Sequence, residues 1–412
     1  MTEGQRQALE KLNLDKGRWE LTRFGDVAIQ QKESVDRDTT EITRYVKGEH
    51  MGSEDLHLRE WGELKNEYLG PAFIRKFGEG DILYGSRRTY LKKVVMAPFE
   101  GITANTTFVI QANAEEINPR LLPFVMLSEG FTEHSIRNSK GSVNPYINWK
   151  DIANYEFLLP PKDQQAKLAE LLWAMDEVVE KEIHILISLI QLKRMKSDFY
   201  FCEGNGSKNL ADFASFKIPN HWAVKKMSDV ARIEYGISKS VANNKNPDIG
   251  WQIITGANIT LGGNFNLSKK RYIEIPTKER FFLEKGDLLF NWRSGSPEHI
   301  GKTALFNLDG NFTYASFILR IRCGSELRKD YAHFLLNYLR QIEYFSKDIA
   351  QQVNFKINAT IFREIKIPVP PLSEQSSIEI MLAQFSELIT DVEGKIKTTK
   401  LLKKSIINQV FS

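Results

Sequence analysis

Basic side chains occur at corresponding places in the two halves of this 412-residue sequence, and their types fit a chemical task. An arginine guanidinium can donate two parallel hydrogen bonds to a guanine edge, and a lysine ammonium suits a phosphate. The candidate DNA contacts of this kind are Arg87, Arg88, Lys92 and Lys93, around Tyr90, and Arg293 and Lys302 in the second half. A solvated hairpin explains any single one of them equally well. The recurrence at Arg87 and Arg293 favours a functional role for that pair.

Two asparagines form a second pair of candidate DNA contacts. Asn144 and Asn354 lie in matching segments of the two halves. An asparagine amide can make two hydrogen bonds with the edge of an adenine. Because an asparagine in a loop more often caps a turn, we place that interpretation ahead of base contact.

The sequence contains no complete motif for catalysis, for a nucleotide or for a metal. Gly301-Lys302-Thr303 resembles the end of a P-loop, but Ser296 stands where that motif needs its first glycine. Asn144-Pro145-Tyr146 lacks the second proline of the Asn-Pro-Pro-Tyr motif of amino-methyltransferases. The seven histidines include no His-Glu-x-x-His pair. We therefore expect no catalytic residue, no metal and no cofactor site in this chain.

The composition is that of an ordinary globular protein, with 42% hydrophobic and 26% charged residues. The net charge is only +4, so any nucleic-acid binding must come from local patches. Cys202 and Cys323 belong to no C-x-x-C pair, which disfavours a disulfide framework or a thiolate zinc site. No apolar run approaches the ~18–20 residues that span a bilayer, and the N-terminus lacks a secretory pattern. We expect a cytoplasmic protein.

An internal repeat places these residues. The segment from Trp19 to Ala28 matches the segment from Trp222 to Ala231, and residues 143–165 match residues 353–375. The offset between the halves grows from 203 to 210 residues, as expected if insertions accumulate in surface loops. Trp19 and Trp222 stand at equivalent places and are better explained as core anchors than as stacking platforms. Two copies of one scaffold therefore carry two different surfaces.

Each half divides into a globular part and a long helix. Short β-rich runs between Gly, Asn and Pro turns predict a mixed α/β (α+β) globular part. Pro160-Pro161 and Pro370-Pro371 each precede a stretch of helix formers, and proline fits only the first turn of a helix. We therefore predict globular domains over residues 1–160 and 206–370, and long helices over residues 161–205 and 371–412.

Both predicted helices carry apolar residues at the alternating spacing of three and four that is typical of a coiled coil. The seam positions are Leu168, Leu172, Met175, Val179 and Leu186 in the first helix, and Ile378, Leu382, Phe385, Ile389, Val392 and Ile396 in the second. A core stripe against the neighbouring domain is the alternative. Some 40 residues give ~60 Å of helix, longer than a small domain is wide, which favours helices that pair with each other. Lys193 and Lys403 interrupt the seams at one equivalent position, where they either set the register or mark an exposed end.

The chain resembles the specificity (S) subunits of type I restriction-modification systems over nearly its whole length. The resemblance rests on Gly80-Asp81-Ile82-Leu83 with Gly286-Asp287-Leu288-Leu289, and on the motif Pro-Pro-x-x-x-Gln, which ends at Gln165 and again at Gln375. It implies two target recognition domains, joined by two long helices that form an antiparallel coiled coil. It also implies double-stranded DNA and two methyltransferase (M) subunits as partners, with restriction nuclease (R) subunits joining through them. S-adenosylmethionine would be bound by the methyltransferase subunits, and this chain would perform no chemistry.

Three functions compete at this stage. The first is a DNA-recognition subunit that reads an asymmetric bipartite target. The second is an enzyme that both binds and modifies DNA, against which the missing cofactor motifs count. The third is a coiled-coil scaffold, which would not need two different basic surfaces. We expect the first.

Overall fold

The computed structural model describes residues 16–36, 39–65, 68–204, 206–238, 246–274, 276, 278–345 and 356–411. These residues form two compact units. The first unit comprises the chain up to Ile185 and again from Val392, and the second comprises Leu186 to Asp391. Within the described part of the chain, no helix is both long and apolar enough to cross a membrane.

The first unit is built on two four-stranded sheets and a two-stranded one. One sheet has the order β2 (Ala28–Gln31), β9 (Thr107–Ala112), β6 (Ile82–Gly85) and β7 (Val94–Met96). The other has the order β4 (Gly62–Glu63), β3 (Arg44–Val46), β8 (Gly101–Ala104) and β5 (Phe73–Phe77). Strand β1 (Glu20–Arg23) pairs with β10 (Glu156–Leu159). The helices of this globular part are α2 (Phe24–Val27), α3 (Leu122–Leu127), α4 (Glu129–Arg137) and α5 (Trp149–Ala153).

The second unit repeats this plan. Its main sheet has the order β14 (Ala231–Tyr235), β20 (Ile318–Cys323), β17 (Leu288–Asn291) and β18 (Thr303–Leu305). A three-stranded sheet consists of β16 (Tyr272–Ile273), β15 (Trp251–Ile254) and β19 (Phe312–Tyr314). Two-stranded sheets pair β11 (Leu210–Phe213) with β12 (Phe216–Pro219), and β13 (Ala223–Lys226) with β21 (Lys366–Val369). Its shorter helices are α7 (Met227–Val230), α8 (Lys329–Gln341) and α9 (Ala359–Glu364).

The main sheets of the two units are equivalent strand by strand. In the first unit β2 and β6 each run antiparallel to β9, and in the second β14 and β17 each run antiparallel to β20. The register is equivalent too, because Leu83 lies opposite Val109 and Leu289 lies opposite Arg320. The repeat predicted from the sequence is therefore a repeat of the fold, and the mixed α/β class is confirmed.

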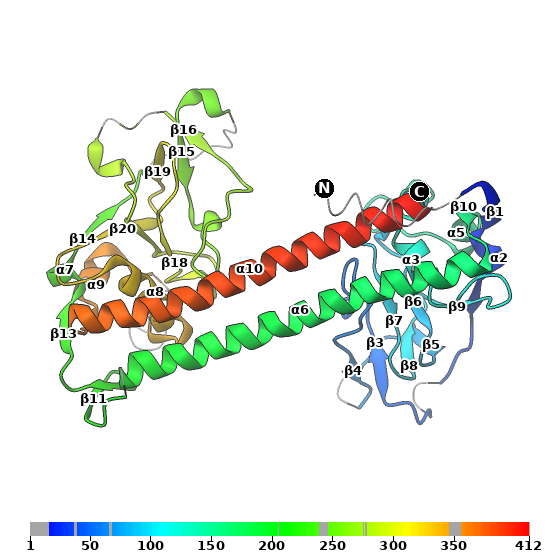
Figure 1. Ribbon diagram of the computed structural model, residues 1–412, viewed down its shortest axis with the longest axis horizontal. Helices are drawn as coiled ribbons and strands as arrows, with labels where there is room; N and C mark the ends of the chain where they lie inside the picture. The colour runs from blue at the N-terminus through cyan, green and yellow to red at the C-terminus, as the bar shows by residue number, and fades with distance from the viewer. Residues whose placement is uncertain are drawn as a thin grey trace. The chain divides into compact units, whose positions relative to one another are not determined.

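The two long helices are α6 (Lys162–Glu203) and α10 (Leu372–Phe411), with 42 and 40 residues (Figure 1). They begin directly after Pro161 and Pro371. The boundary between the two compact units falls inside both helices, so each unit contains the beginning of one helix and the end of the other.

Each unit buries its two helix segments in its own core. In the first unit Leu168 and Leu172 of α6 pack in one cluster with Ile406 and Val410 of α10. In the second unit the apolar cluster contains Ile378 and Leu382 of α10 and Phe201 of α6. Of the predicted seam residues, Leu168, Leu172, Val179, Ile378 and Leu382 are buried, and Met175, Leu186, Phe385, Ile389, Val392 and Ile396 are half-buried. Both seam stripes therefore face protein.

A buried glutamine attaches the start of each long helix to its globular part. Gln165, 2% exposed, accepts a hydrogen bond from the Asn118 N–H at 2.7 Å and donates one to the Pro160 carbonyl at 2.8 Å. Gln375, 0% exposed, makes the equivalent bonds with the Arg328 N–H and the Pro370 carbonyl, both at 2.8 Å. The final glutamine of each Pro-Pro-x-x-x-Gln motif thus ties the first turn of a helix to a loop of the domain before it.

The two repeated tryptophans act beside these glutamines. Trp19 is buried and its indole Nε1 donates to Gln164 Oε1 at 2.8 Å. Trp222 is buried and its Nε1 donates to Glu374 Oε2 at 3.0 Å. The interpretation of both tryptophans as core anchors is confirmed.

Candidate nucleic-acid interface

The two candidate arginines lie at the same edge of equivalent sheets. Arg87 follows the end of β6 by two residues, and Arg293 follows the end of β17 by two. Since β2 and β6 run parallel to each other on either side of β9, their carboxyl ends reach the same edge as the start of β9. The same holds for β14, β17 and β20. The fold therefore presents Arg87 and Arg293 in equivalent ways.

Each arginine is paired through its backbone with the segment that follows a candidate asparagine. Arg87 forms an isolated antiparallel bridge with Tyr146, and Arg293 forms one with Lys356. The bridges continue in hydrogen bonds from the Ile147 N–H to the Ser86 carbonyl at 2.9 Å, and from the Ile357 N–H to the Trp292 carbonyl at 3.1 Å. The structure therefore brings together two regions that the sequence analysis treated separately.

We call the surface formed by Arg87, Arg88, Tyr90, Val143 and Tyr146 the first edge. All five side chains are exposed, from 43% for Tyr146 to 89% for Val143 among the apolar ones. The Arg88 N–H donates to the Pro145 carbonyl at 2.7 Å, which holds the turn against the 143–147 segment. Two guanidinium groups thus project from this edge among exposed apolar and aromatic groups.

We call the surface formed by Tyr235, Trp292, Arg293, Phe317 and Lys356 the second edge. The Arg293 guanidinium lies over the ring of Phe317, 5.1 Å from its centroid, and Phe317 is 47% exposed. The ring of Trp292 lies between those of Phe317 and Tyr235, with centroid distances of 6.1 and 5.7 Å. A guanidinium stacked on an exposed ring can still donate hydrogen bonds from its rim.

Two of the predicted lysines have roles inside the protein. Lys92 is 7% exposed, and its Nζ binds Glu129 Oε2 at 2.7 Å and Glu54 Oε1 at 3.2 Å. Lys302 is 5% exposed, and its Nζ donates to the carbonyls of Gly256 and Ile259 at 2.8 and 2.6 Å. Neither ammonium is presented to DNA, and we correct the expectation for Lys92 and Lys302 on that ground.

The environment of Lys302 differs from that of Lys92 in charge. Burial, together with the nearby positive charge of Arg340, lowers the pKa of Lys302. Lys92 is instead held between two carboxylates. Both lysines hold loops in place, one through backbone carbonyls and the other through ion pairs.

The remaining candidates are placed as follows. Lys93 is half-buried and its Nζ donates to the Gly48 carbonyl. Asn144 is half-buried, and its buried Oδ1 accepts no hydrogen bond from any described residue, so the structure does not show that oxygen capping a turn. Asn354 lies outside the described residues.

Apart from Tyr90, the aromatic residues of the two edges were not among the residues predicted from the sequence. Tyr146, Trp292 and Phe317 are partly exposed beside the candidate arginines. Tyr146 lies inside the repeated 143–148 segment, and Trp292 and Phe317 flank matched landmarks. Their positions relative to the repeat could have identified them as candidate contacts.

The helix segments of each unit are joined by a lysine at an equivalent position. In the first unit Lys403 of α10 forms a buried ion pair with Asp176 of α6. In the second unit Lys193 of α6 donates to Ser386 Oγ of α10 at 2.8 Å. At the offset of the repeat, Lys193 corresponds to Lys403 and Ser386 to Asp176. The polar interruptions of the two seams are therefore cross-helix contacts.

Within the described part of the chain, the first of these lysines pairs with a carboxylate and the second does not, and a histidine lies beside that carboxylate. His57 Nε2 lies 2.7 Å from Asp176 Oδ2, and Arg59 binds Glu180 at 2.6 Å. Burial opposes the ionisation of Asp176, but His57 and Lys403 together hold its pKa below the usual value. The hydrogen bond with Asp176 raises the pKa of His57. In the second unit, burial lowers the pKa of Lys193.

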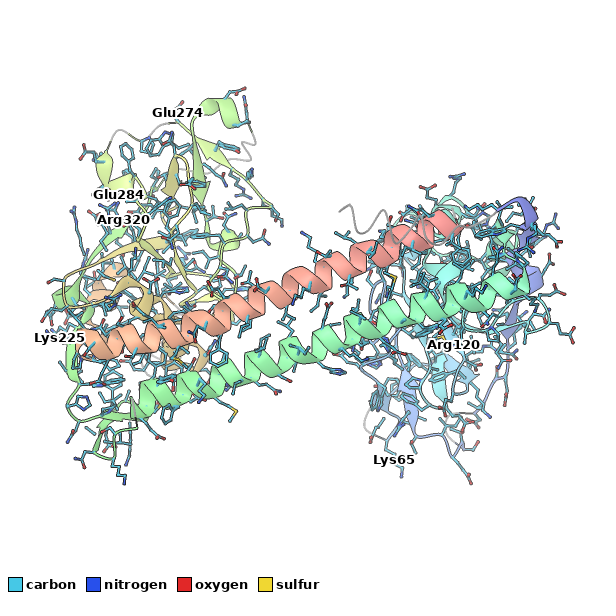
Figure 2. All side chains as sticks on the ribbon, viewed as in Figure 1. Lys65, Arg120, Lys225, Glu274, Glu284 and Arg320 are labelled. Atoms are coloured by element: carbon cyan, nitrogen blue, oxygen red, sulfur yellow. The ribbon has the colours of Figure 1, made fainter. Side chains whose placement is uncertain are left out.

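The globular part of the first unit also touches α6 through an aromatic contact. The guanidinium of Arg120 lies 5.7 Å from the centroid of the Trp173 ring, and Trp173 Nε1 donates to the Arg120 carbonyl at 2.8 Å. Figure 2 labels Arg120 beside this helix. The edges are therefore carried by domains that are fixed to their helix segments by several specific contacts.

Comparison with known families supports a common origin of the two halves. The sequence profile described as "Type I restriction modification DNA specificity domain" matches residues 17–189 and again residues 219–400. The type I restriction enzyme MjaVIII specificity subunit of Methanocaldococcus jannaschii is 23% identical over 433 residues, covering 96% of this chain and 92% of that protein.

Two further relatives match a smaller part. The putative type I restriction enzyme MjaX specificity subunit of Methanocaldococcus jannaschii is 29% identical over 203 residues, 48% of this chain and 47% of that protein. The type I restriction enzyme EcoDI specificity subunit of Escherichia coli is 30% identical over 178 residues, 40% of this chain and 37% of that protein. These two matches span less than half the length of each relative.

Solved structures share the fold. The S subunit of a type I restriction-modification system from M. genitalium has a TM-score of 0.59 at 10% identity, with 96% of both chains covered. A chain from a study of complex assembly and conformational transition of the type I R-M system has a TM-score of 0.56 at 20% identity, with 95% of this chain and 96% of that chain covered.

Proposed function

This chain belongs to the family of type I restriction modification DNA specificity domains, and from that premise we propose that it is the DNA-recognition subunit of a type I restriction-modification complex. Each globular part is a target recognition domain that reads one half of an asymmetric bipartite sequence in double-stranded DNA. The first edge reads one half-site and the second edge reads the other.

One observation carries this proposal. An exposed arginine recurs at the same sheet edge in both units, bridged to the same repeated segment, while the side chains around it differ. The partner across the bridge is Tyr146 in one unit and Lys356 in the other. A shared frame with different neighbours is what two reading surfaces for two different sequences require, because base contacts specify sequence through particular side chains.

The long helices form an antiparallel coiled coil in this proposal, and they set the gap between the half-sites. The contacts Lys403–Asp176 in one unit and Lys193–Ser386 in the other support an antiparallel pair, since each joins the first half of one helix to the second half of the other. The contact between Thr399 Oγ1 of α10 and Glu182 Oε2 of α6 at 3.3 Å is also consistent with antiparallel helices.

The partners follow from the family. Two methyltransferase subunits dock on the helices and bind S-adenosylmethionine, and restriction nuclease subunits join through the methyltransferase complex. This chain supplies sequence recognition and no catalytic residue.

Reconstitution tests the claim that this chain recognises the DNA and that the partner subunits methylate it. The purified chain alone should neither bind S-adenosylmethionine in calorimetry nor methylate DNA, and adding its partner methyltransferase subunits should produce methylation of a defined sequence. Stoichiometric binding of the cofactor by the isolated chain would contradict the proposal.

The spacing role is tested by lengthening both helices together. Seven residues inserted between Ile185 and Leu186, and seven between Asp391 and Val392, add about 10 Å while keeping the apolar stripes in phase. The target of the assembled variant should keep both half-sequences and gain a gap longer by about three base pairs. A folded, assembled variant that keeps its original gap would show that the partner subunits set the spacing.

A further inference from the structure

A groove of about 500 Å³ runs beside β14, the edge strand of the main sheet in the second unit. Three arginines line it: Arg232 on β14, Arg280 on the short helix η5 (Glu279–Phe281), and Arg363 on α9. All three are exposed. The groove therefore collects guanidinium groups from three separate elements.

The groove has an excess of positive charge. Its one lining carboxylate is Glu234, whose Oε1 binds Arg232 at 2.8 Å and whose Oε2 binds the buried Arg320. Figure 2 labels Arg320 within the second globular part. Because the buried Arg320 already neutralises the negative charge of Glu234, the lining residues leave the positive charges of the three arginines unbalanced.

Hydrogen-bond donors remain available in the groove. Arg363 Nη2 donates to the Ile233 carbonyl at 2.8 Å, which uses one of the five N–H groups of its guanidinium. The side chain of Arg232 is 69% exposed. Since the Ile233 carbonyl faces the groove, the N–H of the same residue points to the same side of this antiparallel strand. Arginine donors with a backbone N–H form a surface suited to phosphate oxygens.

The groove is continuous with the second edge. Tyr235 lines the groove and its ring contacts that of Trp292, which precedes Arg293. The hydroxyl of Tyr235 accepts a hydrogen bond from the Ala359 N–H at 2.8 Å, at the start of the helix that carries Arg363. A DNA duplex whose bases are read at the second edge would pass this groove with its backbone.

The first unit lacks an arginine at two of these three positions. At the offsets of the repeat, Arg232 corresponds to Ile29 and Arg363 to Ala153. Ile29 is 47% exposed on β2, which is the edge strand equivalent to β14. Two of the three arginine positions are thus occupied by uncharged residues in the first unit.

We propose that the groove lined by Arg232, Arg280 and Arg363 binds the phosphodiester backbone of double-stranded DNA beside the half-site read by the second domain. This inference rests on the proposed function and adds an asymmetry to it. The second domain holds its half-site with contacts to the DNA backbone that do not depend on sequence, and the first domain has no arginine at the positions of Arg232 and Arg363 to make them.

The test measures DNA affinity as a function of salt in the assembled complex. The groove variant carries Arg232→Ala, Arg280→Ala and Arg363→Ala, and the matched control carries Arg18→Ala, Arg23→Ala and Lys217→Ala, three exposed cations outside the groove. The probes are one duplex with the mapped target and one with a scrambled sequence. The plot of log affinity against log salt should become shallower by about 0.9 for each lost phosphate contact, up to about 2.7 for the groove variant. The affinity for both probes should fall by the same factor.

The outcomes separate this inference from the proposed function. A groove variant with the wild-type slope, or a control variant with the same change in slope, overturns the inference and leaves the proposed function in place. Failure of the wild-type complex to prefer the mapped target overturns the proposed function. A groove variant that loses methyltransferase subunits but keeps its DNA affinity would show that the groove takes an acidic protein segment instead. If the triple variant does not fold, Arg280→Ala alone should reduce the slope by about 0.9.

Discussion

The first and second units share a buried frame and differ where they meet solvent. Gln165 and Gln375 make the same bonds to equivalent backbone groups, and Trp19 and Trp222 donate to equivalent side chains. At the edges, Tyr146 in one unit stands where the other has Lys356. These buried glutamine and tryptophan contacts tolerate little change, because buried polar groups need hydrogen-bond partners. The exposed residues of the two edges are free to vary.

The difference between the units also reaches the helices. Lys403 has the carboxylate of Asp176 as its partner, while Lys193 donates to the hydroxyl of Ser386 and lies over the ring of Phe334, 5.4 Å from its centroid. The second unit therefore holds a partly buried ammonium without a counter-charge from its helix partner. The following predictions use the repeat as its own control, from the largest expected effect to the smallest.

Removing the carboxylate of the first unit should have the largest effect. Asp176→Ala leaves the buried Lys403 without its anion and takes from His57 its nearest carboxylate, which should lower the free energy of unfolding by about 3–5 kcal/mol. The matched change in the second unit, Ser386→Ala, removes one hydrogen bond from Lys193 and should cost about 1 kcal/mol. Denaturant unfolding of the full chain measures both. Equal losses for the two variants would contradict the asymmetry.

The two glutamines should have equal effects, since their bonds are equivalent. Gln165→Leu and Gln375→Leu each remove the acceptor of a partly buried N–H and the donor to the carbonyl of a buried proline, at a cost of about 2–3 kcal/mol. Hydrogen exchange should show the loss at the first turn of α6 for one variant and of α10 for the other. If one variant unfolds like the wild type, the frame is not shared at this point.

The arginines of the edges should act on separate half-sites. Arg87→Ala and Arg293→Ala should each cost about 1–3 kcal/mol in DNA binding if the guanidinium contacts a base. Competition binding with duplexes mutated in one half-site or the other should show relaxed preference only in the half-site of the altered domain. If both variants keep wild-type affinity and preference, the arginines are ordinary solvated side chains.

The smallest effect should come from giving Lys193 the partner that Lys403 has. Ser386→Asp should raise the free energy of unfolding by up to about 1 kcal/mol near neutral pH. In the wild type, burial lowers the pKa of Lys193, so the folded state binds this proton less readily than the unfolded chain. Wild-type stability should therefore gain from this group as the pH rises from the lowered pKa toward the ordinary value of 10.5.

The pH profile supplies the control for this variant. With an aspartate beside Lys193, the gain on raising the pH should disappear or reverse, because the charged form is then favoured in the folded state. Unfolding curves of both proteins between about pH 7 and pH 10 compare the slopes. Parallel profiles would show that Lys193 is hydrated well enough to need no partner.

Sequence reasoning could predict what depends on local pattern and on the repeat. The two proline pairs mark helix starts, and the repeated Trp19 and Trp222 are anchors. Arg87 and Arg293 could be recognised as equivalent because each follows a matched landmark, Gly80-Asp81 or Gly286-Asp287. The strand between each landmark and its arginine has the same length in both halves.

What could not be predicted depends on partners far along the chain. Lys92 looks like a free basic residue in sequence, but its carboxylates come from Glu54 and Glu129, which the fold brings to it. His57 is 119 residues from Asp176, with which it pairs. No periodicity or local motif encodes such contacts, since they are set by the packing of a loop against a helix.

The central claim is that two domains on one repeated frame read two different half-sites, and mapping of methylated bases tests it most directly. Genomes of cells that carry this gene with its methyltransferase partner should be compared with genomes of cells that lack only this gene. The account predicts one methylated motif of two short, different sequences separated by a gap of unread bases, present only with the gene. An uninterrupted motif, two identical half-sequences, or methylation that persists without the gene would contradict it.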